Sequence, residues 1–79
     1  MSDQPRVTLY TRPGCHLCAD AVAELRSLSV DFAEVDITGD RELEAEYGDR
    51  IPVIMLDGKE HGYWRVEGDR LLRALAIPA

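Results

Sequence analysis

No apolar run in this sequence is long enough to cross a bilayer, which excludes a protein that spans a membrane as a helix. Basic residues are also scarce: Lys+Arg 9 stand against Asp+Glu 15, and the formal net charge is -6. This balance argues against a nucleic-acid binder, whose binding face would be basic. It also argues against adsorption to an anionic membrane surface.

Residues 1–5 lack the charged and apolar regions of a secretory signal, so we expect a cytoplasmic protein. Repeats, linkers and low-complexity segments are absent as well, and 79 residues suffice for one small domain over residues 1–79. With 46% hydrophobic and 30% charged residues, the composition is that of an ordinary globular domain. We expect a monomer.

The sequence contains only two cysteines, Cys15 and Cys18, and they form a Cys-x-x-Cys between a strand-like run and a helix-like run. In a reducing compartment such a pair is more often catalytic or metal-binding than a structural staple. A helix start offers free backbone N–H groups and the positive end of the dipole, which favour a thiolate at Cys15. Cys18 lies one turn further on, where it can close a disulfide. The pattern therefore predicts a dithiol–disulfide redox site.

Metal binding is the alternative for the cysteine pair. A structural zinc ion needs four ligands, and the chain offers His16 and His61 besides the two cysteines. His16 is adjacent to Cys15, an awkward position for chelation, so zinc within one chain is disfavoured. We expect no bound metal or cofactor.

Hydrophobic periodicity and turn residues predict seven elements. Strands are expected at 6–11, 30–35, 52–56 and 59–66, and helices at 15–28, 40–47 and 67–77. The first two strands should be parallel, and the Asp57-Gly58 turn should join the last two as an antiparallel hairpin. This βαβαββα order predicts an α/β domain with one four-stranded mixed sheet flanked by three helices.

Three motifs carry a resemblance to a known family: Thr11-Arg12-Pro13-Gly14-Cys15-His16-Leu17-Cys18, then Ile51-Pro52-Val53, then the Asp57-Gly58 hairpin before a last helix. Together they resemble the thioredoxin-fold family, and specifically its small bacterial glutaredoxin-like members, over nearly the full length. The resemblance implies a thioredoxin-like fold and thiol–disulfide oxidoreductase activity.

The resemblance also implies roles for individual residues. Cys15 matches the nucleophile and Cys18 the resolving thiol. Pro52 matches a cis-proline that faces the active-site sulfur, and Ile51 would offer backbone groups to a substrate or to glutathione. Arg12 matches a basic position that precedes the first cysteine, where it could contact glutathione or remain a solvated loop residue.

The family binds the γ-glutamyl end of glutathione at the start of the last helix, which here corresponds to Gly68 and Asp69. The Gly-Gly pair that many members carry in this region is missing, and Glu67 and Asp69 bring carboxylates to it. Carboxylates there would compete for the free N–H donors of the helix start and repel a bound anion. We therefore expect glutathione to bind weakly.

Several alternatives stay open from the sequence. His16 could modulate the site, because histidine is the side chain that acts as a switch at physiological pH, or it could be an exposed residue of the first helical turn. Tyr63 and Trp64 are expected to pack along the last strand, and Phe32 in the core. The expected partners are a disulfide-containing protein or a low-molecular-weight thiol, with glutathione or a flavoprotein reductase as electron donor. The alternative functions are a redoxin served by thioredoxin reductase and a non-catalytic module that binds a partner or an iron–sulfur cluster.

Overall fold

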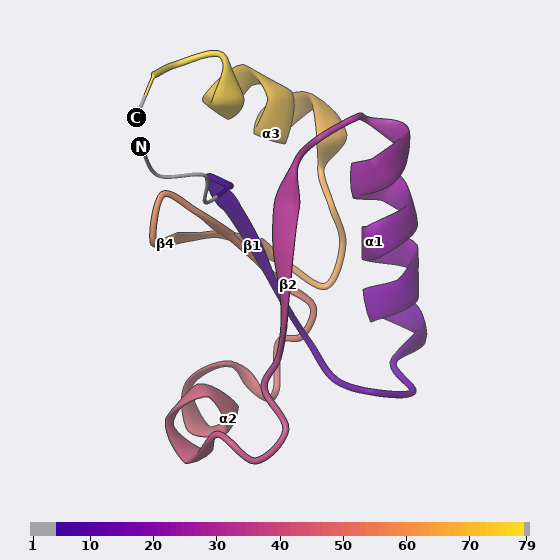
Figure 1. Cartoon of the computed structure of the whole chain (residues 1–79), viewed down its shortest axis with the longest axis vertical. Helices are drawn as coiled ribbons and strands as arrows, with labels where there is room; N and C mark the ends of the chain where they lie inside the picture. The colour runs from indigo at the N-terminus through magenta and orange to yellow at the C-terminus, as the bar shows by residue number, and fades with distance from the viewer. Residues whose placement is uncertain (1–4, 79) are drawn as a thin grey trace.

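The computed structural model describes residues 5–78, and the expectation about residues 1–4 falls outside this range. Four strands and three helices follow one another in the predicted order (Figure 1). Their bounds are β1 Val7–Thr11, α1 His16–Ser27, β2 Phe32–Asp36, α2 Arg41–Tyr47, β3 Val53–Leu56, β4 Lys59–Tyr63 and α3 Gly68–Leu75. Among the described residues, no helix has both the length and the apolar character needed to cross a membrane.

The strands form one mixed sheet with the order β2-β1-β3-β4, which confirms the predicted fold class. β1 and β2 are parallel and are joined through α1, whereas β1 pairs antiparallel with β3 and β3 antiparallel with β4. In β3, the residues Val53, Ile54 and Met55 are all buried, as expected for an inner strand covered on both faces.

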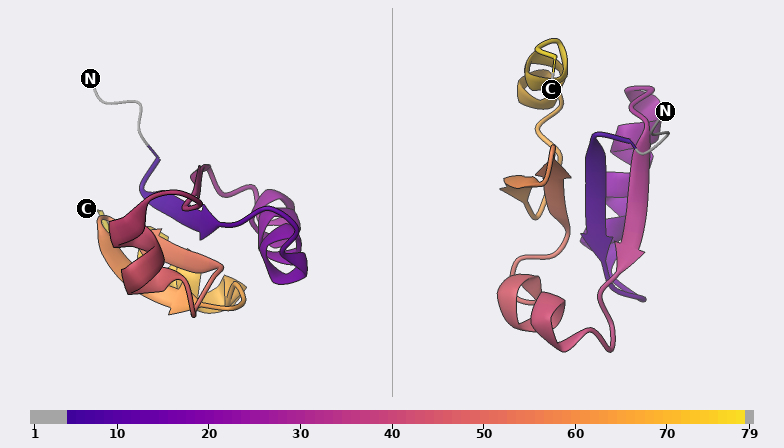
Figure 2. Two further views of the ribbon diagram at one scale, coloured as in Figure 1. Left: turned by 90° about the horizontal axis from the view of Figure 1, so that it is seen from below. Right: turned by 60° about the vertical axis from the view of Figure 1, so that its left-hand side comes forward.

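The two faces of the sheet carry different helices, and Figure 2 shows α2 set apart from α1 and α3. The main core cluster joins β1 and β3 to α1 and α3 through the buried residues Val7, Leu9, Ala21, Leu25, Ile54 and Leu71. Tyr10 alternates with Leu9 along β1 and therefore lies on the opposite face. Its ring is 5.0 Å from that of Tyr47 in α2, which places α2 against this second face.

Two strand boundaries differ from the prediction for identifiable reasons. β4 ends at Tyr63 and not at residue 66, because Trp64 has a φ of 71° that a strand does not allow. β2 begins at Phe32 and not at residue 30, because the Val30 N–H still donates to the Leu25 carbonyl at the end of α1. Phe32 itself packs against the core cluster but is only half-buried.

Candidate active site

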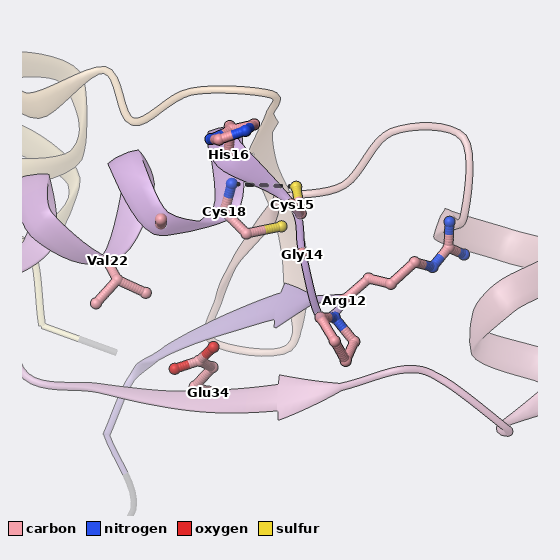
Figure 3. Close-up of a pocket in the computed structure, with 9 residues that line it drawn as sticks. Arg12, Gly14, Cys15, His16, Cys18, Val22 and Glu34 are labelled. Atoms are coloured by element: carbon pink, nitrogen blue, oxygen red, sulfur yellow. Dashed lines mark hydrogen bonds between the residues drawn. The ribbon is translucent and has the colours of Figure 1, made fainter.

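Cys15 occupies the N-cap position of α1. Its backbone is extended, with φ −90° and ψ 113°, and its sulfur accepts a hydrogen bond from the Cys18 N–H at 3.2 Å (Figure 3). The preceding Gly14 has a φ of 76°, a left-handed conformation that glycine adopts without strain and that turns the chain from β1 into the helix. The residue is half-buried, and its sulfur thus occupies the position of a capping acceptor at the N-terminus of α1.

Cys18 lies one turn further into α1 and is only 5% exposed. Its pKa is raised from 9.0 to about 11, first because burial disfavours the thiolate and second because of its hydrogen bond with Cys15. The negative charges of Cys15 and Glu34 raise it further, whereas a hydrogen bond with the Arg12 backbone acts in the opposite direction. The structure therefore separates one accessible sulfur from one shielded thiol, and both cysteines are free.

A cleft of about 390 Å³ opens beside the two cysteines, between α1 and β2. Its lining includes Arg12, Cys15, His16, Cys18, Val22 and Glu34 (Figure 3). Glu34 enters the cleft from β2, and the hydroxyl of the buried Thr11 donates to its Oε2 at 3.0 Å. We call this space the active-site cleft.

The Ile51–Pro52 peptide bond is cis, as the resemblance implies, and Pro52 is fully buried. The carbonyl of Pro52 accepts a hydrogen bond of 2.8 Å from the N–H of Trp64. This bond ties the loop before β3 to the segment that follows β4. The role of the Ile51 backbone in pairing with a substrate stays a prediction.

Comparison with known families identifies the domain. Residues 6–76 match the model of the glutaredoxin-like domain (DUF836), which is nearly the whole chain. The chain belongs to this family.

Relatives of this glutaredoxin-like domain include an uncharacterized protein of Mycobacterium tuberculosis, 45% identical over 82 residues that cover 92% of this chain and 84% of the relative. An X-ray structure of a protein from X. campestris is 40% identical, covers 91% of this chain and 99% of that chain, and gives a TM-score of 0.76. A solution structure of a protein from Nitrosomonas europaea is 28% identical, covers 94% of both chains and gives a TM-score of 0.77.

The same fold occurs in the crystal structure of a thioredoxin-like protein, with a TM-score of 0.67, 22% identity, and coverage of 92% of this chain and 97% of that chain. This similarity concerns the fold alone. It agrees with the mixed sheet and three helices described above, so the glutaredoxin-like domain has a thioredoxin-like fold.

Arg12 and His16 take different positions around the cleft of the glutaredoxin-like domain. The Arg12 side chain points away from the sulfurs toward α2, where its Nη2 lies 3.4 Å from Oε1 of Glu44 (Figure 3). His16 is exposed on the first turn of α1. Contact with glutathione remains a prediction for Arg12, and a modulating role at the site remains a prediction for His16.

The structure does not bring Gly68 and Asp69 to the active-site cleft. A Cβ at Gly68 would lie 3.1 Å from Leu28 and 3.6 Å from Glu24, so α3 begins beside the C-terminal half of α1. Glu24 is nine residues beyond Cys15, which corresponds to roughly 13 Å along the helix axis. Binding of glutathione by the start of α3 therefore stays a prediction, because the structure does not place Gly68 and Asp69 at the active-site cleft.

Sequence reasoning misplaced the side chains of Tyr63 and Trp64 and missed Glu34. Trp64 and its neighbour Tyr63 are 53% and 46% exposed, not packed along the strand as expected, and their rings meet in a T-shape at 4.9 Å. Glu34 could have been noticed as a charged residue inside a strand, but its face depends on the strand register. Within residues 5–78, no group of three or more His, Cys, Asp or Glu side chains is placed to hold a metal ion.

Proposed function

We propose that this domain is a thiol–disulfide oxidoreductase that works through Cys15 and Cys18. The observation that supports this proposal is the capping position of the Cys15 sulfur, with the Cys18 thiol buried one turn behind it. In this arrangement the Cys15 sulfur is accessible for attack on a disulfide, and the Cys18 sulfur is close to it in sequence for the second step. Membership of the glutaredoxin-like family agrees with this chemistry.

In the proposed reaction, the Cys15 thiolate attacks one sulfur of a disulfide, breaks the S–S bond and releases the other sulfur as a thiolate. Cys18 then loses its proton and attacks the Cys15 sulfur of the mixed disulfide. The bond between Cys15 and the partner breaks, and the partner leaves as a second thiolate. Two electrons have then passed to the substrate, and the protein holds a Cys15–Cys18 disulfide.

A reductant must return those two electrons, and we propose a protein reductase of the thioredoxin reductase type as the alternative to glutathione. The exposed Tyr63 and Trp64, linked to the Pro52 loop, offer aromatic area of the kind that protein interfaces use. The compartment proposed for the reaction is the cytosol, where such reductants keep thiols reduced.

Steady-state reduction of a protein disulfide tests the proposal, with NADPH consumption followed in two parallel systems. One contains glutathione and glutathione reductase, and the other contains thioredoxin reductase. We expect turnover in at least one system, faster with thioredoxin reductase, and none with Cys15→Ser. Rapid turnover at low millimolar glutathione that exceeds the thioredoxin reductase rate would contradict the proposed donor.

The matched control is Ser27→Cys in the Cys15→Ser background, which restores the number of thiols at the other end of α1. If this control restored turnover, the position of Cys15 would not matter and the proposal would fail. If neither donor supports turnover and the purified protein is coloured and contains iron, the non-catalytic cluster-binding alternative replaces it.

A further inference from the structure

Glu34 is an exposed residue of β2, which is an edge strand of the sheet. In the parallel pairing of β1 with β2, Glu34 is the partner of Leu9. Paired residues of neighbouring strands project to the same face of a sheet, and Leu9 belongs to the core cluster that α1 covers. The Glu34 side chain therefore lies on the face of the sheet that α1 covers, at the open edge of this layer, where it lines the active-site cleft with both cysteines (Figure 3).

The local contacts hold the carboxylate in place without neutralising it. Thr11 is 3% exposed, and its hydroxyl donates to Oε2 of Glu34 at 3.0 Å. Among residues 5–78, no cationic side chain forms an ion pair with Glu34. The cation closest along the chain to the cysteines, Arg12, is directed to Glu44 on the far side of the site. A fixed, unpaired negative charge thus lies in the same cleft as the Cys18 thiol.

We propose that Glu34 is a positioning residue that slows the second, resolving step of the reaction and leaves the first step largely unchanged. This inference rests on the proposed function and deepens it. The carboxylate touches no reacting atom in the proposal. It acts through the Cys18 thiol, by making the loss of that proton less favourable.

The two steps differ in which sulfur must be negative. In the first step the charge is on Cys15, at the N-cap, where the free N–H groups of α1 stabilise it. In the second step the proton leaves Cys18 for solvent, and the new thiolate shares the cleft with Glu34. The new thiolate and the Glu34 carboxylate repel each other across the cleft, so we expect Glu34 to slow the second step and not the first.

A slower resolving step lengthens the life of the mixed disulfide between Cys15 and its partner. During that time a thiol from solution can attack the partner's sulfur, which breaks the bond to Cys15, forms a disulfide between the partner and the incoming thiol, and releases Cys15 as a thiolate. Glu34 therefore shifts the balance between two outcomes, closure of the Cys15–Cys18 disulfide and release of Cys15 by an external thiol.

The reagent DTNB separates the steps, because each one releases the coloured thiol TNB. Attack by Cys15 releases the first equivalent, and closure by Cys18 releases the second. The variant Glu34→Gln removes the charge but keeps an oxygen for the Thr11 hydrogen bond. Glu42→Gln is the matched control, since it removes the same charge from an exposed position on α2.

We expect the second TNB phase of Glu34→Gln to have a lower pH midpoint and to be faster at neutral pH, by less than about threefold. The gain in thiolate is partly offset because a less basic thiolate is also a weaker nucleophile. The first phase and the Glu42→Gln control should be little changed. Higher ionic strength should accelerate the second phase of the wild type more than that of Glu34→Gln, which provides a test independent of folding effects.

An unchanged second phase, or one slowed by Glu34→Gln, would overturn the inference, the latter because it would make Glu34 a base. Failure of the proposed function looks different. In that case the wild type would release both equivalents of TNB from DTNB and show the Glu34 effect, yet would turn over with neither reductase system.

Discussion

Helices α1 and α3 begin with nearly the same backbone and very different chemistry. The N-cap residue of α1, Cys15, has φ −90° and ψ 113°, and the N-cap residue of α3, Glu67, has φ −93° and ψ 90°. At α1 the cap side chain accepts a backbone N–H, whereas at α3 no side chain does. Every helix start offers free N–H groups and the positive end of the dipole, and the residue at the N-cap position determines whether a reactive group can use them.

Surroundings add to the difference between the two starts. The start of α1 borders the active-site cleft, so its sulfur can meet a partner. The start of α3 packs against Leu28 and Glu24 of α1, and only a residue without a side chain fits at Gly68 without displacing them. The start of α3 therefore packs against α1, whereas the start of α1 carries the sulfur that we propose to be reactive. The following experiments separate these roles.

The largest expected effect is covalent. Cys18→Ser should accumulate a mixed disulfide between Cys15 and its substrate, because the resolving thiol is gone while the capped nucleophile remains. Cys15→Ser should accumulate none. Intact-mass measurement after incubation with a protein disulfide checks both variants. A stable adduct on Cys18 in the Cys15→Ser protein would mean that the two sulfurs have exchanged roles.

Cys18 should be alkylated about two orders of magnitude more slowly than an unperturbed thiol. The pKa of Cys18 is raised from 9.0 to about 11, which lowers its thiolate fraction at neutral pH by roughly 100-fold. We expect iodoacetamide to label Cys15 first, as peptide mass spectrometry would show. Labelling of Cys18 at the same rate as Cys15 would contradict the assignment of Cys15 as the accessible sulfur and Cys18 as the shielded one.

A side-chain cap can be added to α3 to make the two helix starts more alike. Glu67→Ser should raise the free energy of unfolding by about 0.5–1 kcal/mol relative to Glu67→Ala, because serine can accept a free N–H of the first turn. Urea unfolding measures the difference. The alkylation rate of Cys15 should not change in either variant. Equal stability of the serine and alanine variants would show that this start has no donor left to cap.

The smallest expected effect concerns the pH dependence of stability and His61 in β4. Folding lowers the pKa of His61 below its ordinary value of 6.5, mainly because of burial and next because of the positive charge of Arg70. The unfolded chain therefore binds a proton more readily than the folded protein. The associated stability is complete above pH 6.5 and is lost as the pH falls through 6.5 toward the lower folded pKa.

We expect a modest fall in the urea midpoint between about pH 7.5 and about pH 5.5, and a smaller fall in His61→Gln. His16→Gln is the control, because His16 is exposed at the start of α1. If His16→Gln removed the pH dependence and His61→Gln did not, the effect would belong to α1.

The sequence was sufficient for the architecture and for half of the site. Order, sheet composition and the Cys15 cap all follow from local signals, namely apolar periodicity, turn residues and a Cys-x-x-Cys at a helix start. The ends of elements were less predictable: Trp64 ends β4 through a left-handed backbone that its residue type does not suggest. Glu34 could not be found because its position depends on which residue of β1 it faces, and pairing register is a long-range property.

The order β2-β1-β3-β4 leaves β2 and β4 as edge strands, whose outer backbone groups have no partner among the described strands. Such edges invite pairing with another chain, and charged side chains are a common protection against it. β2 carries Glu34 and Asp36, and β4 carries Lys59 and Glu60. A second copy that paired along β2 would bring carboxylates close together, which is destabilising. We therefore expect the charges of β2, Glu34 among them, to disfavour pairing of two copies along this edge.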